Sequence, residues 1–538
     1  MSVLPRFIAM RTLPVFLAGF VLLSSVLSQP ATAQITAFKQ AVAEAASTDD
    51  EVAAFYRTNH YTPIWTGTGA ADLARRAALM RALAAAETHG LPAHRYDAAG
   101  LMQQMRDVRT TRDLGMVEVA LSQALVTYAR DIQSGILVPS KIDDGLVRKV
   151  NYTDRAEYLV GISQENPNIF MNGLAPQNRE YTGLMKEKLR LELLVAKGGW
   201  GTKVPSGKFK PGQTGTSVVK LRNRLISMGY MTNSATQTYD SVIQKAVQKF
   251  QLEHGLEADG VAGEITVDEI NVSAQARLKS VIVAMERERW LVRDRGTRHV
   301  LVNQTDFSAA IIDDDKVTFR TRSVIGKNVS DRRSPEFSDT MEHMVINPSW
   351  YVPRSIATKE YLPKLRRNPN AVQHLIITDG AGRQVNRANI DFTQYSARNF
   401  PFDMRQPPST RNALGLVKFI FPNKYNIYLH DTPQKSLFAR ESRAFSHGCI
   451  RLAQPFEFAY ALLAVQTDNP KAYFQKVLKS GNETKVKLDQ PIPVHLIYRT
   501  AITMPRGGTE YRRDVYGRDA KIWRALAAQG VVLSDVQG

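Results

Sequence analysis

The stretch AFSHGCIRL, residues 444–452, contains Cys449, the only cysteine among 538 residues. His447 lies two residues before it and Arg451 two residues after it, and Gly448 separates the histidine from the cysteine. A thiol becomes an effective nucleophile when a neighbouring base or positive charge favours the thiolate. The alternative is a small buried side chain that is chemically inert. The rest of the chain decides between these two interpretations.

The length and charge of the chain limit the kinds of protein it can be. At roughly 100 to 200 residues per domain, 538 residues predict three or four domains. Lys and Arg number 70 and Asp and Glu number 51, so the formal net charge is +19. This excess indicates a polyanionic environment, which is nucleic acid, an anionic membrane or an acidic cell-wall polymer.

Residues 1–33 have the pattern of a secretory signal peptide. Arg6 and Arg11 precede an apolar run at 13–27, and the small residues at 31–33 supply a cleavage site. The run is too short for a comfortable membrane span, although an uncleaved anchor is the alternative. Cleavage would leave a mature chain with a net charge of about +17 and no stable membrane span. Because an exported protein is not expected to meet nucleic acid, the cell wall or a membrane surface is the expected polyanion. Because structural cysteines of exported proteins come in pairs, a lone thiol favours a chemical role.

Residues 34–205 are predicted to form a helical scaffold domain. Apolar residues recur there with helical spacing: Leu114, Val117, Leu121, Leu125, Tyr128 and Ile132. Leu73, Met80 and Leu83 mark an earlier helix that ends before Gly90. We assign these residues to the core. The stretch at 198–215 is rich in Gly, Pro and Lys, and it predicts an exposed linker.

Residues 212–273 are predicted to form a compact unit of two helices and a third, shorter one. One apolar face consists of Val218, Leu221, Leu225 and Met228, behind Thr216 or Ser217 as cap. The second face consists of Ile243, Ala246, Val247 and Phe250, and it ends at Gly255. The stretch FQLEHGLEADGVAGEIT, residues 250–266, resembles the D-G-x-x-G-x-x-T ending of the small three-helix peptidoglycan-binding domain. The resemblance implies wall binding, whereas the pattern without it would indicate a helical spacer.

From residue 297 the period changes to that of β-strands. HVLVNQ, AAIID, FRTRSVIG and HMVINPSWYVP are short, β-branched segments, and LVKFIFP and YNIYLHDTP resume the pattern. Residues 354–412 interrupt it with a long insertion that holds Arg354, Lys364, Arg366, Arg367, Arg383, Arg387, Arg405 and Arg411. We interpret the insertion as a lid over an anionic substrate, the alternative being a solvated basic surface. Residues 506–538 are expected to be a C-terminal tail of the 297–505 domain.

Two histidines are candidates for the base that activates Cys449. His430 is expected at the end of a strand, and the glycine-containing SHGC turn follows 19 residues later. His447 lies within that turn. A strand end and a nearby turn can converge, but the spacing along the chain does not choose between the two histidines.

SHGCIRL, residues 446–452, together with YLHDTP, residues 428–433, resembles the signature of the YkuD-type L,D-transpeptidase catalytic domain, a β-sandwich enzyme with a cysteine nucleophile. The order of parts resembles the large L,D-transpeptidases of Gram-negative bacteria. This resemblance implies a multidomain α+β protein with a helical scaffold, a three-helix peptidoglycan-binding domain and a β-sandwich catalytic domain with an inserted lid. It also implies a periplasmic, wall-associated location.

The same resemblance implies roles for individual residues. Cys449 matches the nucleophile and His430 the base, and the supporting positions of the motif match Ser446, His447, Gly448 and Arg451. Some large members carry Ser where His447 stands, which leaves the role of His447 open. Arg451 is expected to hold a substrate carboxylate or, alternatively, to pin carbonyls of its own turn. Tyr428 and Trp350 are expected to line the stem-peptide cleft, with a place in the core as the alternative.

The implied reaction needs no cofactor. Cys449 attacks the carbonyl before the terminal D-Ala of a tetrapeptide donor stem, releases D-Ala and forms a thioester, which an amine of an acceptor stem converts into a 3-3 cross-link. His430 transfers the protons, and the amides of Gly448 and Cys449 are the expected oxyanion donors. The implied partners are both stem peptides, together with other cell-wall synthesis proteins. A carbapenem is expected to acylate the same thiol.

Several alternatives remain at this stage. Water as acceptor would give an L,D-carboxypeptidase, a free D-amino acid would give exchange, and a lipoprotein lysine would give an anchor. A non-catalytic wall-binding protein is a further alternative, against which the combination of Cys449 and His430 argues. A zinc site formed by His430, His447 and Cys449 is the last, although the sequence lacks a ligand helix of the H-E-x-x-H type.

Overall fold

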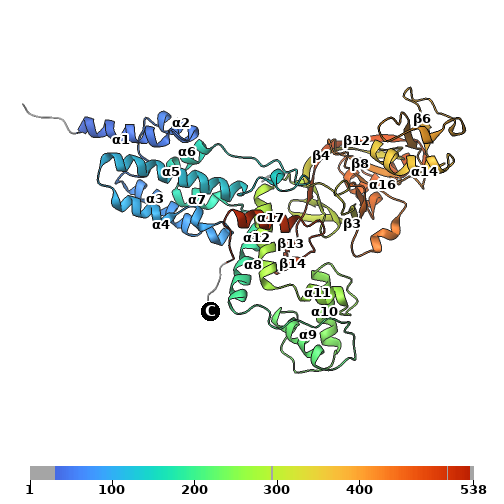
Figure 1. The fold of residues 1–538 in the computed structure, drawn as a ribbon, viewed down its shortest axis with the longest axis horizontal. Coiled ribbons are helices and arrows are strands. Elements are labelled where there is room, and N and C mark those ends of the chain that lie inside the picture. The colour runs from blue at the N-terminus through green and yellow to red at the C-terminus, as the bar shows by residue number, and fades with distance from the viewer. Residues whose placement is uncertain (1–30, 292–294, 506, 534–538) are drawn as a thin grey trace, which may run out of the picture.

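The computed structural model describes residues 31–291, 295–505 and 507–533 (Figure 1). The predicted signal peptide, residues 1–33, lies outside these residues except for its last three positions, which belong to the first helix. Within the described ranges no helix combines the length and the apolar character that crossing a membrane requires.

The N-terminal part is a bundle of helices, as the apolar spacing predicts. Its helices are α1 Ala31–Ala46, α2 Asp50–Thr58, α3 Ala70–Ala84, α4 Ala98–Asp107, α5 Thr111–Ser134, α6 Arg155–Gln164 and α7 Pro167–Leu174, with short 3-10 turns η1 Ala86–His89, η2 Ala93–Arg95 and η3 Pro139–Lys141. Thr110 and Asp113 form a capping box that starts α5.

The predicted apolar stripe of α5 is confirmed as core. Val117, Leu121, Leu125, Tyr128 and Ile132 are buried, and Leu114 packs against them. For α3 the prediction is confirmed for Leu83, which is buried, and for Met80, which packs against the core, but it was wrong for Leu73, which is 53% exposed. The spacing of the three apolar residues did not show that the first turn of this alanine-rich helix would lie outside the core.

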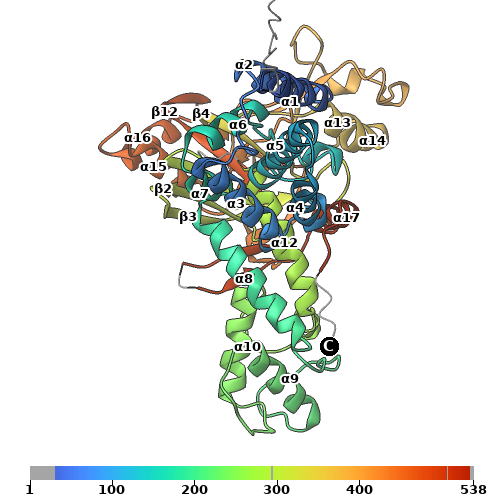
Figure 2. The same ribbon diagram turned by 90° about the vertical axis from the view of Figure 1, so that its left-hand side faces the viewer.

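Two long helices connect the bundle to a small helical unit. α8 Arg179–Ala196 and α12 Ala274–Trp290 pack side by side, and the chain between them forms α9 Thr216–Ser227, α10 Ser241–Glu253 and α11 Glu264–Ile270 (Figure 2). The two predicted apolar faces form the core of this unit, except that Met228 is only partly buried. Gly215, not Thr216 or Ser217, is the residue that precedes α9 at its cap.

The segment at 198–215 is not an exposed linker throughout. Val204 and Phe209 are buried in the core of the small unit. The backbones of Phe209 and Ala262 exchange two hydrogen bonds of 2.9 Å. Val204 and Phe209, two isolated apolar residues, therefore attach this Gly-rich and Lys-rich segment to the small helical unit.

The C-terminal segment is also more than a tail. β13 Ala501–Thr503 pairs with β14 Thr509–Tyr511, and α17 Arg518–Ala528 packs against α12. Tyr511, Ile522 and Leu526 are buried in the core that α8 and α12 share. Residues 501–533 therefore pack against α8 and α12 and add to their shared core.

The C-terminal end of α12 is a buried cluster of charges. Glu286, Arg287, Glu288 and Arg289 are all at most 5% exposed, although all four carry charged side chains. Arg287 forms ion pairs with Glu336, at 2.7 Å, and with Asp519, at 3.0 Å. Arg289 pairs with Glu286 at 2.8 Å. Arg287 thus joins α12 to α17 and to the residue before β4, and Glu286 accepts a hydrogen bond of 2.9 Å from the Leu137 amide, which follows α5.

The main sheet holds the β-rich part of the chain predicted from residue 297, with His430 and the residues on either side of Cys449. Its strands are β1 Arg298–Asn303, β2 Ser308–Asp313, β3 Lys316–Gly326, β4 Phe337–Ile346, β8 Val417–Ile420, β9 Leu429–His430, β10 Ala444–Ser446, β11 Ile450–Leu452 and β12 Thr484–Ile497. They are ordered β10-β3-β11-β9-β8-β4-β12-β1-β2, and β2 also pairs with β3, so the sheet closes on itself around an apolar core. Helices α15 Pro455–Leu463 and α16 Pro470–Lys479 contact this sheet.

The insertion is an ordered unit with its own core, and we call residues 350–412 the cap. It contains β5 Trp350–Tyr351, β6 Ile376–Thr378 and β7 Asp403–Gln406 in one small sheet, with α13 Arg354–Ile356, a π-helical turn η4 Ala357–Tyr361, α14 Leu362–Arg367, η5 Arg387–Asn389 and η6 Phe392–Gln394. Figure 1 shows β6 and α14 at the end of the molecule away from the scaffold.

Much of the basic character of the cap is structural. Arg354, Arg366 and Arg387 donate hydrogen bonds to backbone carbonyls within the cap. Arg383 pairs with Asp379 at 2.9 Å. An arginine that satisfies buried carbonyls is not available to a ligand. Only some of the arginines that the sequence singled out therefore remain as candidates for substrate binding.

Candidate active site

The site is built on the parallel pairing of β9 with β11. Leu429 lies opposite Ile450, and His430 lies opposite Arg451. Leu429 and Ile450 are fully buried in the core of the sheet. Because side chains alternate between the two faces of a strand, Tyr428, His430, Cys449 and Arg451 share the other face. The rings of Tyr428 and His430 lie 5.6 Å apart, which agrees with this placement.

A short turn between β10 and β11 carries the thiol. Ser446 closes it, since its hydroxyl donates to the Cys449 carbonyl at 2.6 Å and accepts from the Gly448 amide at 3.1 Å. Gly448 has φ of +117°, a conformation that residues with a Cβ rarely adopt. Ser334 holds the turn from a neighbouring loop by donating to the Gly448 carbonyl at 2.6 Å.

Cys449 is partly buried and its thiol is held in the neutral form. Burial raises the pKa of the Cys449 thiol to about 11, against the opposing effects of the Tyr428 amide, the Tyr428 phenol and Arg451. Sγ lies 3.4 Å from the Asn426 carbonyl oxygen, to which it donates. The resting thiol is therefore not the preformed thiolate that a paired imidazole would produce.

His430 is buried and neutral. Burial lowers the pKa of His430 to about 3, and the positive charge of Arg451 acts in the same direction. Its Nδ1 bonds to the Asp431 carbonyl oxygen, which can only accept, so Nδ1 carries the proton. Nε2 is then unprotonated and has the lone pair that a base needs, and the Leu414 carbonyl also lies near the ring and raises the pKa of His430. In the described part of the chain no hydrogen bond yet joins this ring to Cys449 Sγ, a contact that a bound substrate can complete.

The structure separates the two histidines that the sequence left as alternatives. His447 Nε2 bonds to Glu360 Oε1 of the cap at 2.6 Å, whereas His430 shares the face of Cys449. The same separation disfavours the alternative of a zinc site, because His430, His447 and Cys449 bond to different partners. Among the described residues, no group of three or more His, Cys, Asp or Glu side chains is placed to hold a metal ion.

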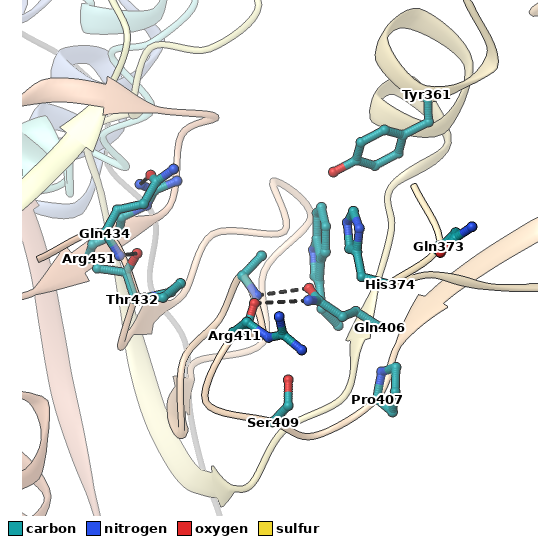
Figure 3. Close-up of a pocket in the computed structure, with 13 residues that line it drawn as sticks. Tyr361, Gln373, His374, Gln406, Pro407, Ser409, Arg411, Thr432, Gln434 and Arg451 are labelled. Carbon is teal, nitrogen blue, oxygen red and sulfur yellow. Dashed lines mark hydrogen bonds between the residues drawn. The ribbon is translucent and has the colours of Figure 1, made fainter. Parts of the chain in front are cut away.

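A cavity of about 770 Å³ lies between the main sheet and the cap. Arg451, Thr432 and Gln434 form one wall, and Tyr361, His374 and Gln406 of the cap form the facing wall, with Arg411 and Ser409 at one end (Figure 3). Trp350 also lines the cavity, although it is 9% exposed and mainly part of the cap core. Tyr428 is partly buried beside Cys449 and is not a lining residue of the cavity.

Arg451 faces this cavity and does not pin the turn. Its Nη1 donates to the Gln434 side chain at 2.6 Å, and its buried Nε has no partner in the described structure. Arg411 lies across the cavity, is exposed, and makes no side-chain hydrogen bond or ion pair with any residue that the structure describes. The two guanidinium groups are therefore the cations of the site that remain available to an anionic ligand.

Several of these residues were not predicted by sequence as part of a site. Glu360, Gln434 and Tyr361 belong to no motif, and Arg411 was one of several basic residues named in the insertion. Their roles depend on how the cap folds against the sheet. Of these residues, only Arg411 could have been suspected from the sequence, because it lies in an insertion rich in basic residues.

Comparison with protein families assigns three parts of the chain. Residues 297–486 match the YkuD family, described as the L,D-transpeptidase catalytic domain. That range contains β1 to β11, the cap and the turn with Cys449. This part of the chain is therefore similar in sequence to L,D-transpeptidase catalytic domains. Two other parts of the chain match a scaffold domain, residues 50–187, and a family described as "Putative peptidoglycan binding domain", residues 214–270.

A curated relative supports the assignment of the catalytic part. The chain is 32% identical over 244 residues to a Haemophilus influenzae (strain ATCC 51907 / DSM 11121 / KW20 / Rd) protein named "Putative L,D-transpeptidase". The match covers 45% of this chain and 48% of the relative, so the chain spans about half the length of that protein.

Solved structures with partial similarity include two L,D-transpeptidases. One, from Xylanimonas cellulosilytica DSM 15894, is 16% identical with a TM-score of 0.17 and covers 55% of this chain and 98% of that one. The other, from Stackebrandtia nassauensis, is 15% identical with a TM-score of 0.21 and covers 55% and 96%. These scores are too low to add to the family assignment.

The burial of Cys449 predicts an unusual pH dependence of its alkylation. Iodoacetamide reacts with thiolate, so the rate should keep rising through pH 8.5 and level off only near pH 11, because the folded site disfavours the charged form. The measurement is the rate of mass increase of the intact protein, which is unambiguous because Cys449 is the only thiol. A plateau at or below pH 8.5 would contradict the burial argument, and the unfolded protein in denaturant is the control.

Proposed function

We propose that this protein is an L,D-transpeptidase that forms 3-3 cross-links in peptidoglycan through a thioester on Cys449. The observation that carries the proposal is that β9 and β11 bring His430, Cys449 and Arg451 onto one face, beside a cavity that the cap completes. The family of residues 297–486 supports the reaction class. The family of residues 214–270 supports peptidoglycan as substrate and a location in the periplasm or at the cell wall.

In the first half-reaction the Cys449 sulfur attacks the carbonyl carbon of the third residue of a tetrapeptide donor stem. His430 Nε2 takes the thiol proton during the attack, because the thiol is neutral beforehand. The C–N bond to D-Ala then breaks, and the imidazolium gives its proton to the departing amine. The products are free D-Ala and a thioester between the third residue and Cys449.

The second half-reaction regenerates the enzyme. An amine of an acceptor stem attacks the thioester carbonyl, His430 removes one proton from that amine, and the same proton returns to the sulfur as the C–S bond breaks. No external oxidant, reductant or cofactor is needed for this exchange of one amide for another.

The oxyanion of both half-reactions needs N–H donors aimed at one point. The sequence predicted the amides of Gly448 and Cys449. In the resting structure the Gly448 amide donates to the Ser446 hydroxyl, at 3.1 Å, which leaves the Cys449 amide as the donor we propose. Ser446 and Gly448 then act by shaping the turn, and Tyr428 acts by contacting the thiol.

Charge recognition of the stem peptide is assigned to the two cavity arginines. A stem peptide carries free carboxylates, and a planar guanidinium can bind a carboxylate through two parallel hydrogen bonds. Arg451 lies on the catalytic wall and Arg411 on the cap. We propose that the substrate lies between them, with its scissile carbonyl toward Cys449.

The acceptor is tested by incubating the protein with tetrapeptide-rich peptidoglycan and analysing the muropeptides by mass. We expect 3-3 dimers and free D-Ala with the wild type, and neither with Cys449→Ser, because an alcohol needs stronger activation than a thiol. Tripeptides without dimers would replace cross-linking by L,D-carboxypeptidase activity. No release of D-Ala by a folded wild-type protein would overturn the proposed function.

The role of the cavity arginines predicts a difference between two cap residues. Arg411→Ala should raise KM for a stem-peptide donor about threefold to tenfold, because one charge-assisted hydrogen bond is lost at a solvated site. Arg367→Ala is the matched control, since Arg367 is an exposed cap arginine that does not line the cavity. The effect should shrink at high salt. Equal KM values for the two variants at low salt would remove Arg411 from the binding site.

A further inference from the structure

The turn that carries Cys449 is held from two sides. From below, Ser334 donates to the Gly448 carbonyl, and the Lys327 amide donates to the Ser446 carbonyl at 2.8 Å. On the side of the cap, the His447 imidazole bonds to Glu360 at 2.6 Å, its only hydrogen bond or ion pair with a residue that the structure describes. His447 stands between Ser446 and Gly448, so the direction of its side chain constrains the backbone that places the thiol.

Glu360 connects three separate segments. It comes from the π-helical turn of the cap, its Oε1 accepts from His447 Nε2, and the same oxygen accepts from Arg332 Nη2 at 2.7 Å. Arg332 belongs to the loop after β3, and its carbonyl oxygen lies near Gly448. One carboxylate thus joins the cap, the catalytic turn and the loop that supports the turn.

The next residue along the chain connects this contact to the cavity. Tyr361 lines the cavity, and its ring lies 6.3 Å from that of Trp350 and 6.5 Å from that of His374. Helical turns with π geometry are uncommon and are frequent at functional sites. A single turn of the cap therefore contacts the substrate cavity through Tyr361 and the catalytic turn through Glu360.

We propose that Glu360 is a positioning residue for Cys449, which holds the catalytic turn in register with the cap through His447 and Arg332. This inference rests on the proposed function, because it assigns a role in the same reaction. The contact is half-exposed, and exposed ion pairs contribute little to stability, so its loss should affect the turn without unfolding the domain.

The chain offers a matched control next to Glu360. Lys359 pairs with Asp331 at 3.0 Å, so it joins the same cap turn to the same loop, but it does not touch His447. If Glu360 acts only by attaching the cap, Lys359→Ala and Glu360→Ala should have similar effects. If it acts through the catalytic turn, only Glu360→Ala should affect the reaction.

The test compares D-Ala release by full-length variants. Glu360→Ala should lower kcat about tenfold with KM within about twofold, because a small displacement of a reacting group is costly. Lys359→Ala should stay within about twofold of the wild type. Glu360→Gln should recover part of the loss, since its amide oxygen can accept from both Arg332 and His447. Glu360→Ala combined with His447→Ala should be no slower than the slower single variant.

Alkylation of Cys449 gives a second reading that does not depend on the proposed function. Glu360→Ala should raise the iodoacetamide rate about threefold or more at pH 8, because a loosened turn exposes the thiol, whereas Lys359→Ala should not. The inference would be overturned if Glu360→Ala and Lys359→Ala had the same kcat and the same alkylation rate. It would also be overturned if the losses of kcat in the Glu360→Ala, His447→Ala double variant were additive. A wild-type protein that released no D-Ala would instead overturn the proposed function, and alkylation would still decide whether Glu360 holds the turn.

Discussion

The parallel pairing of β9 with β11 is the constraint on which the site depends. It sets Leu429 and Ile450 into the core, and by alternation it sets His430, Cys449 and Arg451 on the opposite face. A shift of one residue in this register would turn His430, Cys449 and Arg451 toward the apolar core and turn Leu429 and Ile450 away from it. The fully buried pair of Leu429 and Ile450 therefore fixes the placement of these side chains as well as the packing, and β9 and β11 are interior strands that also pair with β8 and β3.

The surroundings of the site determine how its groups can work. Burial keeps the thiol protonated and the imidazole unprotonated, so both are neutral at pH 7. A neutral pair avoids an ion pair in a poorly solvated place, and it requires the proton to move during the attack on the carbonyl. The cap contributes one wall of the cavity, and Glu360 contacts the turn itself, so the insertion belongs to the site.

Sequence predicted best what depends on short-range pattern. The α5 stripe from Val117 to Ile132 and the two apolar faces of the 212–273 unit follow from helical spacing, and the SHGC and YLHDTP motifs pointed to the part of the chain that forms the site. Patterns failed where tertiary contacts decide. Leu73 is exposed although Leu83 of the same predicted stripe is buried, and the charges at 286–289 are buried because they pair with one another and with distant residues such as Glu336. The role of Glu360 depends on the folded cap, and no local signal marks it.

The most direct test of the account is intact-protein mass spectrometry with a carbapenem, whose strained carbonyl can acylate an activated thiol. The wild type should gain the mass of one drug molecule, Cys449→Ser should gain none, and a chelator should change nothing. His430→Ala should be acylated more slowly than His447→Ala, because only His430 shares the face of the thiol. Its rate should recover only as the pH approaches about 11, the pKa of the buried thiol, and not near 8.5 as for a free one. An adduct on Cys449→Ser, or faster acylation of His430→Ala than of His447→Ala at pH 7, would contradict the account.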